Sequence, residues 1–263
     1  MADAHEDLTL QERERLFGKQ LTERFPALWP CLEQVIQRSS DLFAACPPRV
    51  LHKISDSELA SRTLMARLIT DLYAVCTLGW RGYLAQTITL ASSTLESAYL
   101  LTYIGLNDKT ARQWLDHPDA TRQLFSVFDL IRGALSHQDH PSGQPWAPSE
   151  LDDHAKSEYH IYQQMCGVKH LNAVMHMPLG IQLQPSGGSI VVGPQFSDQC
   201  FDVTLWTLYH VARVTLQAAD AFARGHAPKI ALAQLKATLP GIESLLNDLV
   251  VYLDPPFSTR LER

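Results

Sequence analysis

Apolar residues recur at intervals of three or four along most of the chain. The intervals are clearest within residues 64–75, 124–135 and 242–250. Such spacing places the apolar side chains on one face of a helix. The pattern therefore predicts an all-α fold, a multi-helix bundle in which amphipathic helices bury their apolar faces against one another.

Local signals predict where the helices begin and end. Thr9 with Glu12, and Ser55 with Glu58, have the spacing of a capping box, which satisfies free N–H groups in the first turn of a helix. Proline and glycine residues separate the helices. The predicted helices span 9–25, 30–45, 55–79, 83–104, 107–114, 118–135, 148–176, 201–224 and a last one around 242–250.

One short segment has a different period. Residues 181–184 and 189–192 alternate apolar and polar side chains on either side of Pro185-Ser-Gly-Gly188. Alternation around a Gly-Gly turn predicts one small β-hairpin inserted in the bundle. Because two strands alone are marginally stable in water, we expect the hairpin to lie against the helices.

The length and composition fit a single helical domain over residues 1–263. Hydrophobic residues make up 46% of the chain and charged residues 19%, values typical of a globular protein. The proline-rich loop at 138–148 joins two halves without marking a domain boundary. We therefore expect N-terminal helices within 9–46 to pack on a core bundle within 55–253.

Charge and cysteine usage narrow the class of protein. The net charge of -6 argues against an overall electrostatic grip on nucleic acid, although it does not exclude a local basic patch. The five cysteines form no CxxC pair and are typical of reduced thiols in a cytosolic protein. Charges such as Arg67, Asp71 and Arg213 interrupt the apolar stretches, and the first seven residues are polar and acidic. The sequence thus predicts a cytoplasmic protein without a membrane span or a secretion signal.

The helix predicted over 148–176 concentrates reactive side chains. Tyr162, Cys166 and His170 are spaced by four residues and would line one side of it. Cys166 and His170 also have the spacing of a nucleophile–base pair. Burial in mid-helix instead favours a packed and inert thiol, which is the interpretation we prefer.

Glu96 is the most informative charge. It lies beside Tyr99 in the helix predicted over 83–104, which has few other charges. A carboxylate in such a helix is either buried and paired or faces a cleft. We expect a structural polar bridge to His170, to an arginine or to a tyrosine hydroxyl, with a pocket residue as the alternative. The two helices should accordingly pack against each other.

Two blocks of residues carry a resemblance to a known family. They are Ser92-x3-Glu96 and Tyr162-x3-Cys166-x3-His170. Their order and spacing over about residues 60–225 resemble a group of mostly bacterial helical proteins, which are in turn similar to the HEPN superfamily of helical bundles. In that group the blocks read Arg-x3-Glu and Tyr-x3-Ser/Cys-x3-His. The resemblance implies a helical bundle and, for the ribonucleases of the superfamily, an Arg-x4–6-His motif that acts on RNA at a dimer interface.

The chain departs from the ribonuclease pattern. Ser92 stands where the first block has arginine, and Gln163, Gln164 and Met165 stand upstream of His170 where the nucleases have one. Lys169 is expected to point away around the helix. These departures weaken the ribonuclease interpretation.

A literal Arg-x4-His motif occurs elsewhere, at Arg132 and His137. It lies at a predicted helix end, where cationic side chains also interact favourably with the helix dipole. We prefer this structural interpretation to a catalytic one. No metal or cofactor is expected, because the chain has no HExxH, no repeated Glu-x-x-His and no phosphate-binding loop.

The leading functional hypothesis is a non-enzymatic HEPN-like binding or regulatory module, which the resemblance places in bacterial defence or stress response. One alternative is a metal-independent ribonuclease that uses His170, or Arg132 with His137. Another is a small-molecule-binding bundle. Its cleft would be lined by Glu96, Tyr99, Tyr162, Cys166 and His170. Candidate partners are a second copy of the chain, RNA or a small molecule, and not a membrane.

Overall fold

The computed structural model describes residues 8–46, 54–105, 107–117, 124–138, 145–169, 181–184, 187–190 and 193–253. Its helices are α1 (Leu10–Arg24), α2 (Leu28–Ala45), α3 (Asp56–Trp80), α4 (Leu84–Ile104), α5 (Asp108–Leu115), α6 (Val127–Ser136), α7 (Pro148–Lys169), α9 (Asp198–His226) and α10 (Lys229–Val250). The all-α bundle predicted from the apolar spacing is confirmed.

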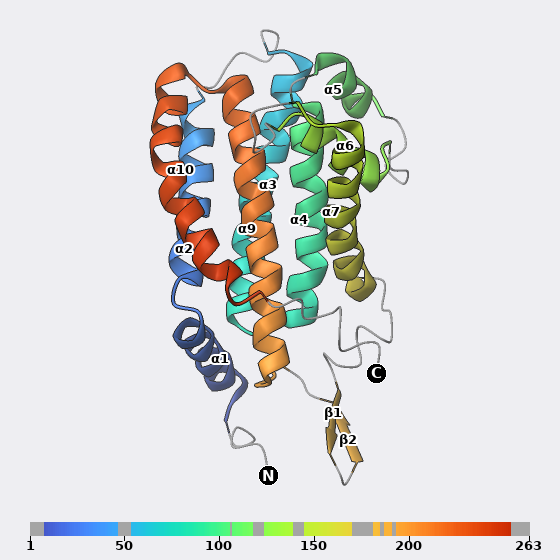
Figure 1. Cartoon of the computed structure of the whole chain (residues 1–263). Coiled ribbons are helices and arrows are strands. Elements are labelled where there is room, and N and C mark those ends of the chain that lie inside the picture. Colours follow the sequence, from blue (N-terminus) through green and yellow to red (C-terminus); the bar gives the residue numbers. More distant parts are fainter. Residues whose placement is uncertain are drawn as a thin grey trace.

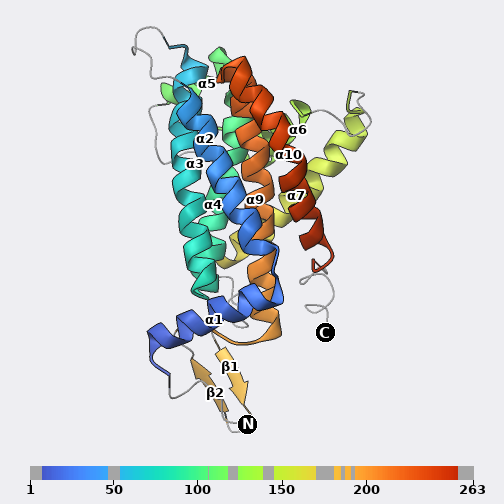
Figure 2. The same cartoon turned by 90° about the vertical axis from the view of Figure 1, so that its left-hand side faces the viewer.

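Helices α4 and α9 form the centre of the bundle (Figure 1). Helix α4 packs against α3, α9, α7 and α6, while α2 covers α9 and α3, and α10 lies against α2 and α9. Helix α1 crosses one end of the bundle (Figure 2). This central position explains why α4 carries so few charges, since a charged side chain is costly to bury on any of its faces.

Side-chain caps fix the start of several helices. Thr9 and Glu12 form the predicted capping box of α1, and the Ser55 hydroxyl accepts the Glu58 N–H at the start of α3. The predicted start of the sixth helix at Pro118 is wrong. Ser126 caps α6, which begins at Val127.

The last two helices also differ from the prediction. Gly225 was expected to end the helix predicted over 201–224 but lies within α9, which continues to His226 and closes with an Ala227 N–H to Ala223 O hydrogen bond. Helix α10 begins at Lys229 and contains Pro240, so it starts well before residue 242. Both helices thus continue past residues that usually interrupt a helix.

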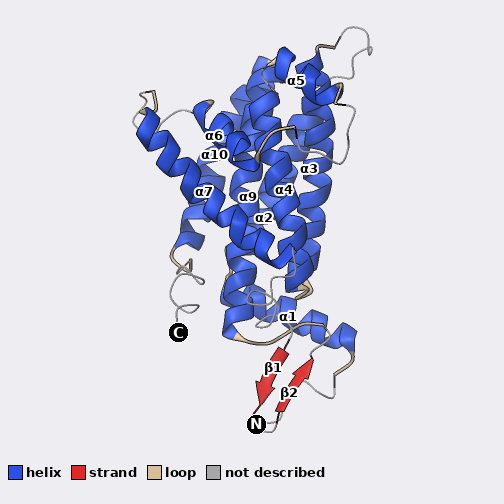
Figure 3. Cartoon of the chain, turned by 90° about the vertical axis from the view of Figure 1, so that its right-hand side faces the viewer, coloured by secondary structure: helices blue, strands red, loops and turns tan. Residues whose placement is uncertain are grey.

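The β structure of the described residues consists of β1 (Ile181–Gln184) and β2 (Gly187–Ile190), paired antiparallel with Ile181 opposite Ile190. Gly187 and Gly188 belong to β2, so their assignment to the turn is wrong. Both strands lie beyond the end of the bundle at which α1 is found and do not lie along its helices (Figure 3). Residues 170–176 of the predicted long helix fall outside the described residues.

The helices of the described part of the chain lack the combination of length and apolarity that crossing a membrane requires.

Candidate functional site

The candidate site is the contact between α4 and α7, which we call the α4–α7 seam. It comprises Glu96 and Tyr99 of α4 and Glu158, Tyr162 and Lys169 of α7. Earlier residues of α4 face later residues of α7, so the two helices run antiparallel. The seam thereby brings together two blocks that lie about 60 residues apart in the sequence.

The first polar contact of the seam surrounds Glu96. The Tyr162 hydroxyl donates a hydrogen bond of 2.7 Å to Glu96 Oε1, and Lys169 Nζ lies 3.4 Å from the same oxygen. The Glu96 side chain is 23% exposed and that of Lys169 31%, so the ion pair is only partly shielded from water. A tyrosine hydroxyl, one of the three partners considered for Glu96, is therefore present.

The expectation that Lys169 points away from the site is wrong. Lys169 follows Tyr162 by seven residues, which is nearly two full turns of an α-helix. The two side chains therefore lie on the same face of α7 and meet the same carboxylate.

The second polar contact surrounds Glu158 and is more deeply buried. Its Oε2 accepts hydrogen bonds from the Tyr99 hydroxyl at 2.8 Å and from Arg213 Nη2 of α9 at 2.6 Å. The Glu158 side chain is 7% exposed and that of Arg213 20%. Burial raises the pKa of Glu158, but Arg213 and Tyr99 outweigh burial and hold the pKa below its ordinary value. Glu158 is thus an ionised carboxylate that joins three helices.

Glu158 and Arg213 were missed as a pair in the sequence. Arg213 appeared only as a charge that interrupts an apolar stretch. Part of the signal was present, because Arg213 lies in the middle of a long helix whose neighbouring positions are apolar, and such a charge is expected to find a partner when it is buried. Glu158 gave no comparable signal, since its helix carries several other charges.

His210 stands one turn before Arg213 on α9. Its ring contacts the rings of Trp206 and Tyr209, with centroids 4.8 Å and 5.1 Å away. Its Nδ1 is buried and has no hydrogen-bond partner among the described residues. Burial, aided by the positive charge of Arg213 and opposed by Glu158, lowers the pKa of His210 to about 3. The imidazole is therefore neutral at neutral pH and cannot supply a proton there.

Cys166 lies at the seam but its thiol is not activated. Burial raises its pKa, an effect that its contacts with Tyr162 and Lys169 reduce without reversing. Since the thiolate is the nucleophile, a raised pKa makes this cysteine slow to react. His170 lies outside the described residues, so its packing near Glu96 and its pairing with Cys166 stay predictions.

The Arg132 and His137 motif lies away from the seam's carboxylates, at the end of α6. Arg132 forms an ion pair with Asp152 of α7, and His137 is the exposed C-cap of α6. Arg132 thus joins α6 to α7, and its charge is already balanced. This arrangement agrees with the structural interpretation of the motif.

The described residues contain no group of three or more His, Cys, Asp and Glu side chains that could hold a metal ion. Comparison of the chain with protein-family models, with curated proteins and with solved structures finds no match. Of the five predicted ligand-binding residues, the seam brings together Glu96, Tyr99, Tyr162 and Cys166.

Proposed function

We propose that the protein is a non-enzymatic HEPN-like helical module that binds or regulates a partner, in bacterial defence or stress physiology. The observation that supports this proposal is the mutual pairing of charges at and beside the seam. Lys169 faces Glu96, Arg213 faces Glu158 and Arg132 faces Asp152.

Cleavage of RNA without a metal ion requires a cation at the scissile phosphate and a group that transfers a proton. Each of the three cations named above is held by a carboxylate. A phosphate would have to displace that carboxylate and leave it unpaired, and for Glu158 the loss would occur in a buried position. The polar residues of the seam are thus better suited to holding helices together than to catalysis.

Incubation of the purified protein with a labelled single-stranded RNA in excess chelator tests this proposal. We expect no cleavage above the buffer control. Cleavage that disappears in His170→Ala, with the variant still folded by circular dichroism, would contradict the proposal and favour the ribonuclease. Cleavage lost only in Arg132→Ala or His137→Ala would assign the activity to the other motif. Lys156→Ala, which removes an exposed lysine paired with Asp153, is the matched control.

A small-molecule-binding bundle is the second candidate function. The observation that favours it lies away from the seam. A surface hollow of about 160 Å³ is found beside α1, where two arginines and a tryptophan converge.

A further inference from the structure

The hollow lies between the first turns of α1 and the corner that joins α3 to α4. Its volume is about 160 Å³. It is lined by Gln11, Glu14, Arg15, Trp80 and Arg81. None of these residues belongs to the α4–α7 seam, so the hollow is a separate candidate site.

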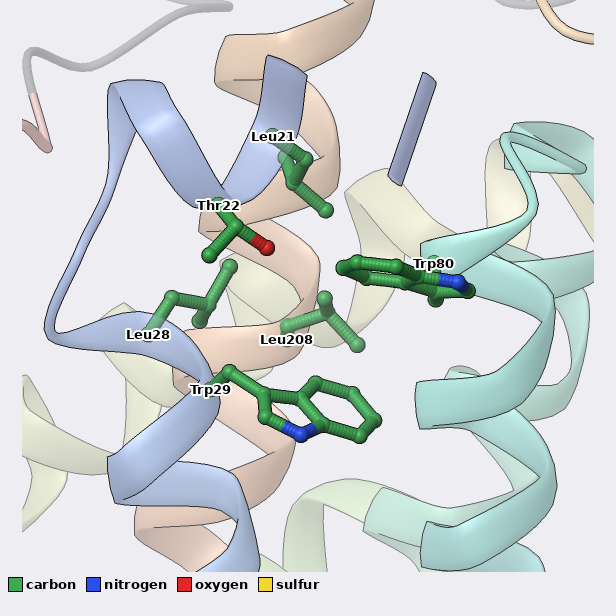
Figure 4. A pocket seen from close by; sticks show the side chains of 6 residues that line it. All are labelled: Leu21, Thr22, Leu28, Trp29, Trp80 and Leu208. Carbon is green, nitrogen blue, oxygen red and sulfur yellow. The ribbon is translucent and has the colours of Figure 1, made fainter. Parts of the chain in front are cut away.

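Trp80 lines the hollow and packs closely against α1. Its ring lies so close to α1 that a Cβ atom added to Gly18 would be only 2.3 Å from Trp80 Cε2. Trp29 packs against it with ring centroids 5.6 Å apart. On this inner side Trp80 helps to close a cavity of about 10 Å³, and its nitrogen edge points away from the residues that line that cavity (Figure 4). Trp80 therefore lines both the small cavity and the hollow.

The charged groups of the hollow favour an anion. Glu14 Oε1 accepts a hydrogen bond of 2.6 Å from the Tyr83 hydroxyl, and Arg81 Nη1 is 3.9 Å from Glu14 Oε2. Arg15 has Glu12 as a neighbour, but the carboxylate of Glu12 is hydrogen-bonded in the N-terminal cap of α1. Two guanidinium groups and only one carboxylate thus line the hollow, and that carboxylate already accepts a short hydrogen bond.

We infer that this hollow binds a small aromatic acid, with its ring on Trp80 and its carboxylate between Arg15 and Arg81. A cavity of about 150 Å³ admits a benzene ring, so the volume suits a ligand of one ring. With α1 over the indole ring, a ligand ring meets the edge of Trp80, and an edge-to-face arrangement of two aromatic rings is attractive. Guanidinium groups form strong, directional hydrogen bonds with carboxylates.

The test is a titration with benzoate in which the side-chain N–H signal of Trp80 is monitored in ¹H–¹⁵N spectra. The chain has five tryptophans, so Trp80→Phe assigns the signal. We expect a saturable shift at Trp80. Cyclohexanecarboxylate, which has the same charge and a similar size but no π system, should bind about fivefold more weakly. Benzyl alcohol, which keeps the ring and lacks the charge, should also bind more weakly.

Arg81→Gln should weaken benzoate binding about tenfold, the factor that corresponds to ~1.4 kcal/mol. The matched control is Arg67→Gln, which removes another exposed arginine of the α3 region that pairs with Asp71. It should leave binding unchanged. The inference is overturned if Trp80 shows no saturable shift, if Arg81→Gln binds as the wild type does, or if cyclohexanecarboxylate binds equally well. These results are independent of the RNA test, which concerns different residues.

Discussion

The Tyr99 hydroxyl of α4 donates a hydrogen bond of 2.8 Å to Glu158 of α7. Close by, the relationship is reversed, because the Tyr162 hydroxyl of α7 donates to Glu96 of α4 at 2.7 Å. Each helix therefore provides one tyrosine and one glutamate to a crossed pair. Arg213 supplies the opposite charge for the buried glutamate. This arrangement fixes both the spacing and the register of the two helices.

Arg213→Met tests the buried half of this arrangement. The substitution keeps much of the side-chain length but leaves Glu158 charged and without its cation. Removing one partner of a buried ion pair typically costs about 3–5 kcal/mol. We expect a loss of that order in the free energy of unfolding, measured in urea at pH 7.

The double substitution of Arg213→Met with Glu158→Gln is the control for this experiment. It removes the uncompensated charge, so it should recover part of the stability lost in the single variant. A single variant within 1 kcal/mol of the wild type would show that the ion pair contributes little.

The neutral His210 predicts a specific dependence of stability on pH. The unfolded chain takes up a proton near pH 6.5, whereas folded His210, buried beside Arg213, does so only near pH 3. Protonation therefore favours the unfolded state between these values, and stability falls as the pH is lowered. Between pH 7 and pH 5 this group should account for a loss of about 2 kcal/mol.

His210→Gln removes that contribution. Its free energy of unfolding should change less between pH 7 and pH 5 than that of the wild type, with the other histidines common to both proteins. Parallel pH profiles for the two proteins would mean that His210 titrates normally in the folded state.

Substitution by alanine should have opposite effects on protein stability at two glycines that lie in helices. At Gly18 the added methyl group would overlap the Trp80 ring, and overpacking of this kind costs about 1–3 kcal/mol. At Gly241 of α10 nothing lies within 4 Å of the added atom, so the higher helix propensity of alanine should stabilise the protein by about 0.5–1 kcal/mol. Thermal unfolding of the two variants compares them directly. Equal effects at both sites would contradict the close packing of α1 on Trp80.

The cysteines should differ in their reactivity toward iodoacetamide. Cys31 and Cys76 are fully buried, and burial raises the pKa of each to about 12. Cys166 is half-buried, and its raised pKa is moderated by Lys169. In the native protein at pH 8 we expect slow labelling of Cys166 and none of the other two, as followed by peptide mass spectrometry. Labelling of Cys31 at the rate of free cysteine would show that its helix opens readily.

Much of the helical architecture follows from local sequence signals. The capping residues Thr9, Ser55 and Asn107 each stand immediately before a helix. Such caps act through hydrogen bonds within one turn, so they can be recognised without knowledge of the tertiary structure. Gly225 misleads because α9 continues past it to His226, with Phe222 and Ala223 buried in the turn before it.

The seam was predictable only in part. The isolated charge of Glu96 on an apolar helix indicated a buried or paired carboxylate, and a tyrosine hydroxyl is its partner. The sequence did not indicate that Arg213 meets Glu158, because that pairing depends on how α9 approaches α7 in space. Helical geometry alone would have placed Lys169 correctly, two turns beyond Tyr162.

We conclude that the polar residues of the seam hold α7 on α4. A double-mutant cycle with Tyr162→Phe and Glu96→Ala, measured by urea unfolding, is the sharpest test of this claim. A hydrogen bond to a charged group contributes about 1.5–3 kcal/mol, and partial exposure of Glu96 should lower this value. We predict that each single variant is destabilised and that the coupling energy is about 1 kcal/mol. Two single variants as stable as the wild type, with a coupling energy near zero, would contradict the claim.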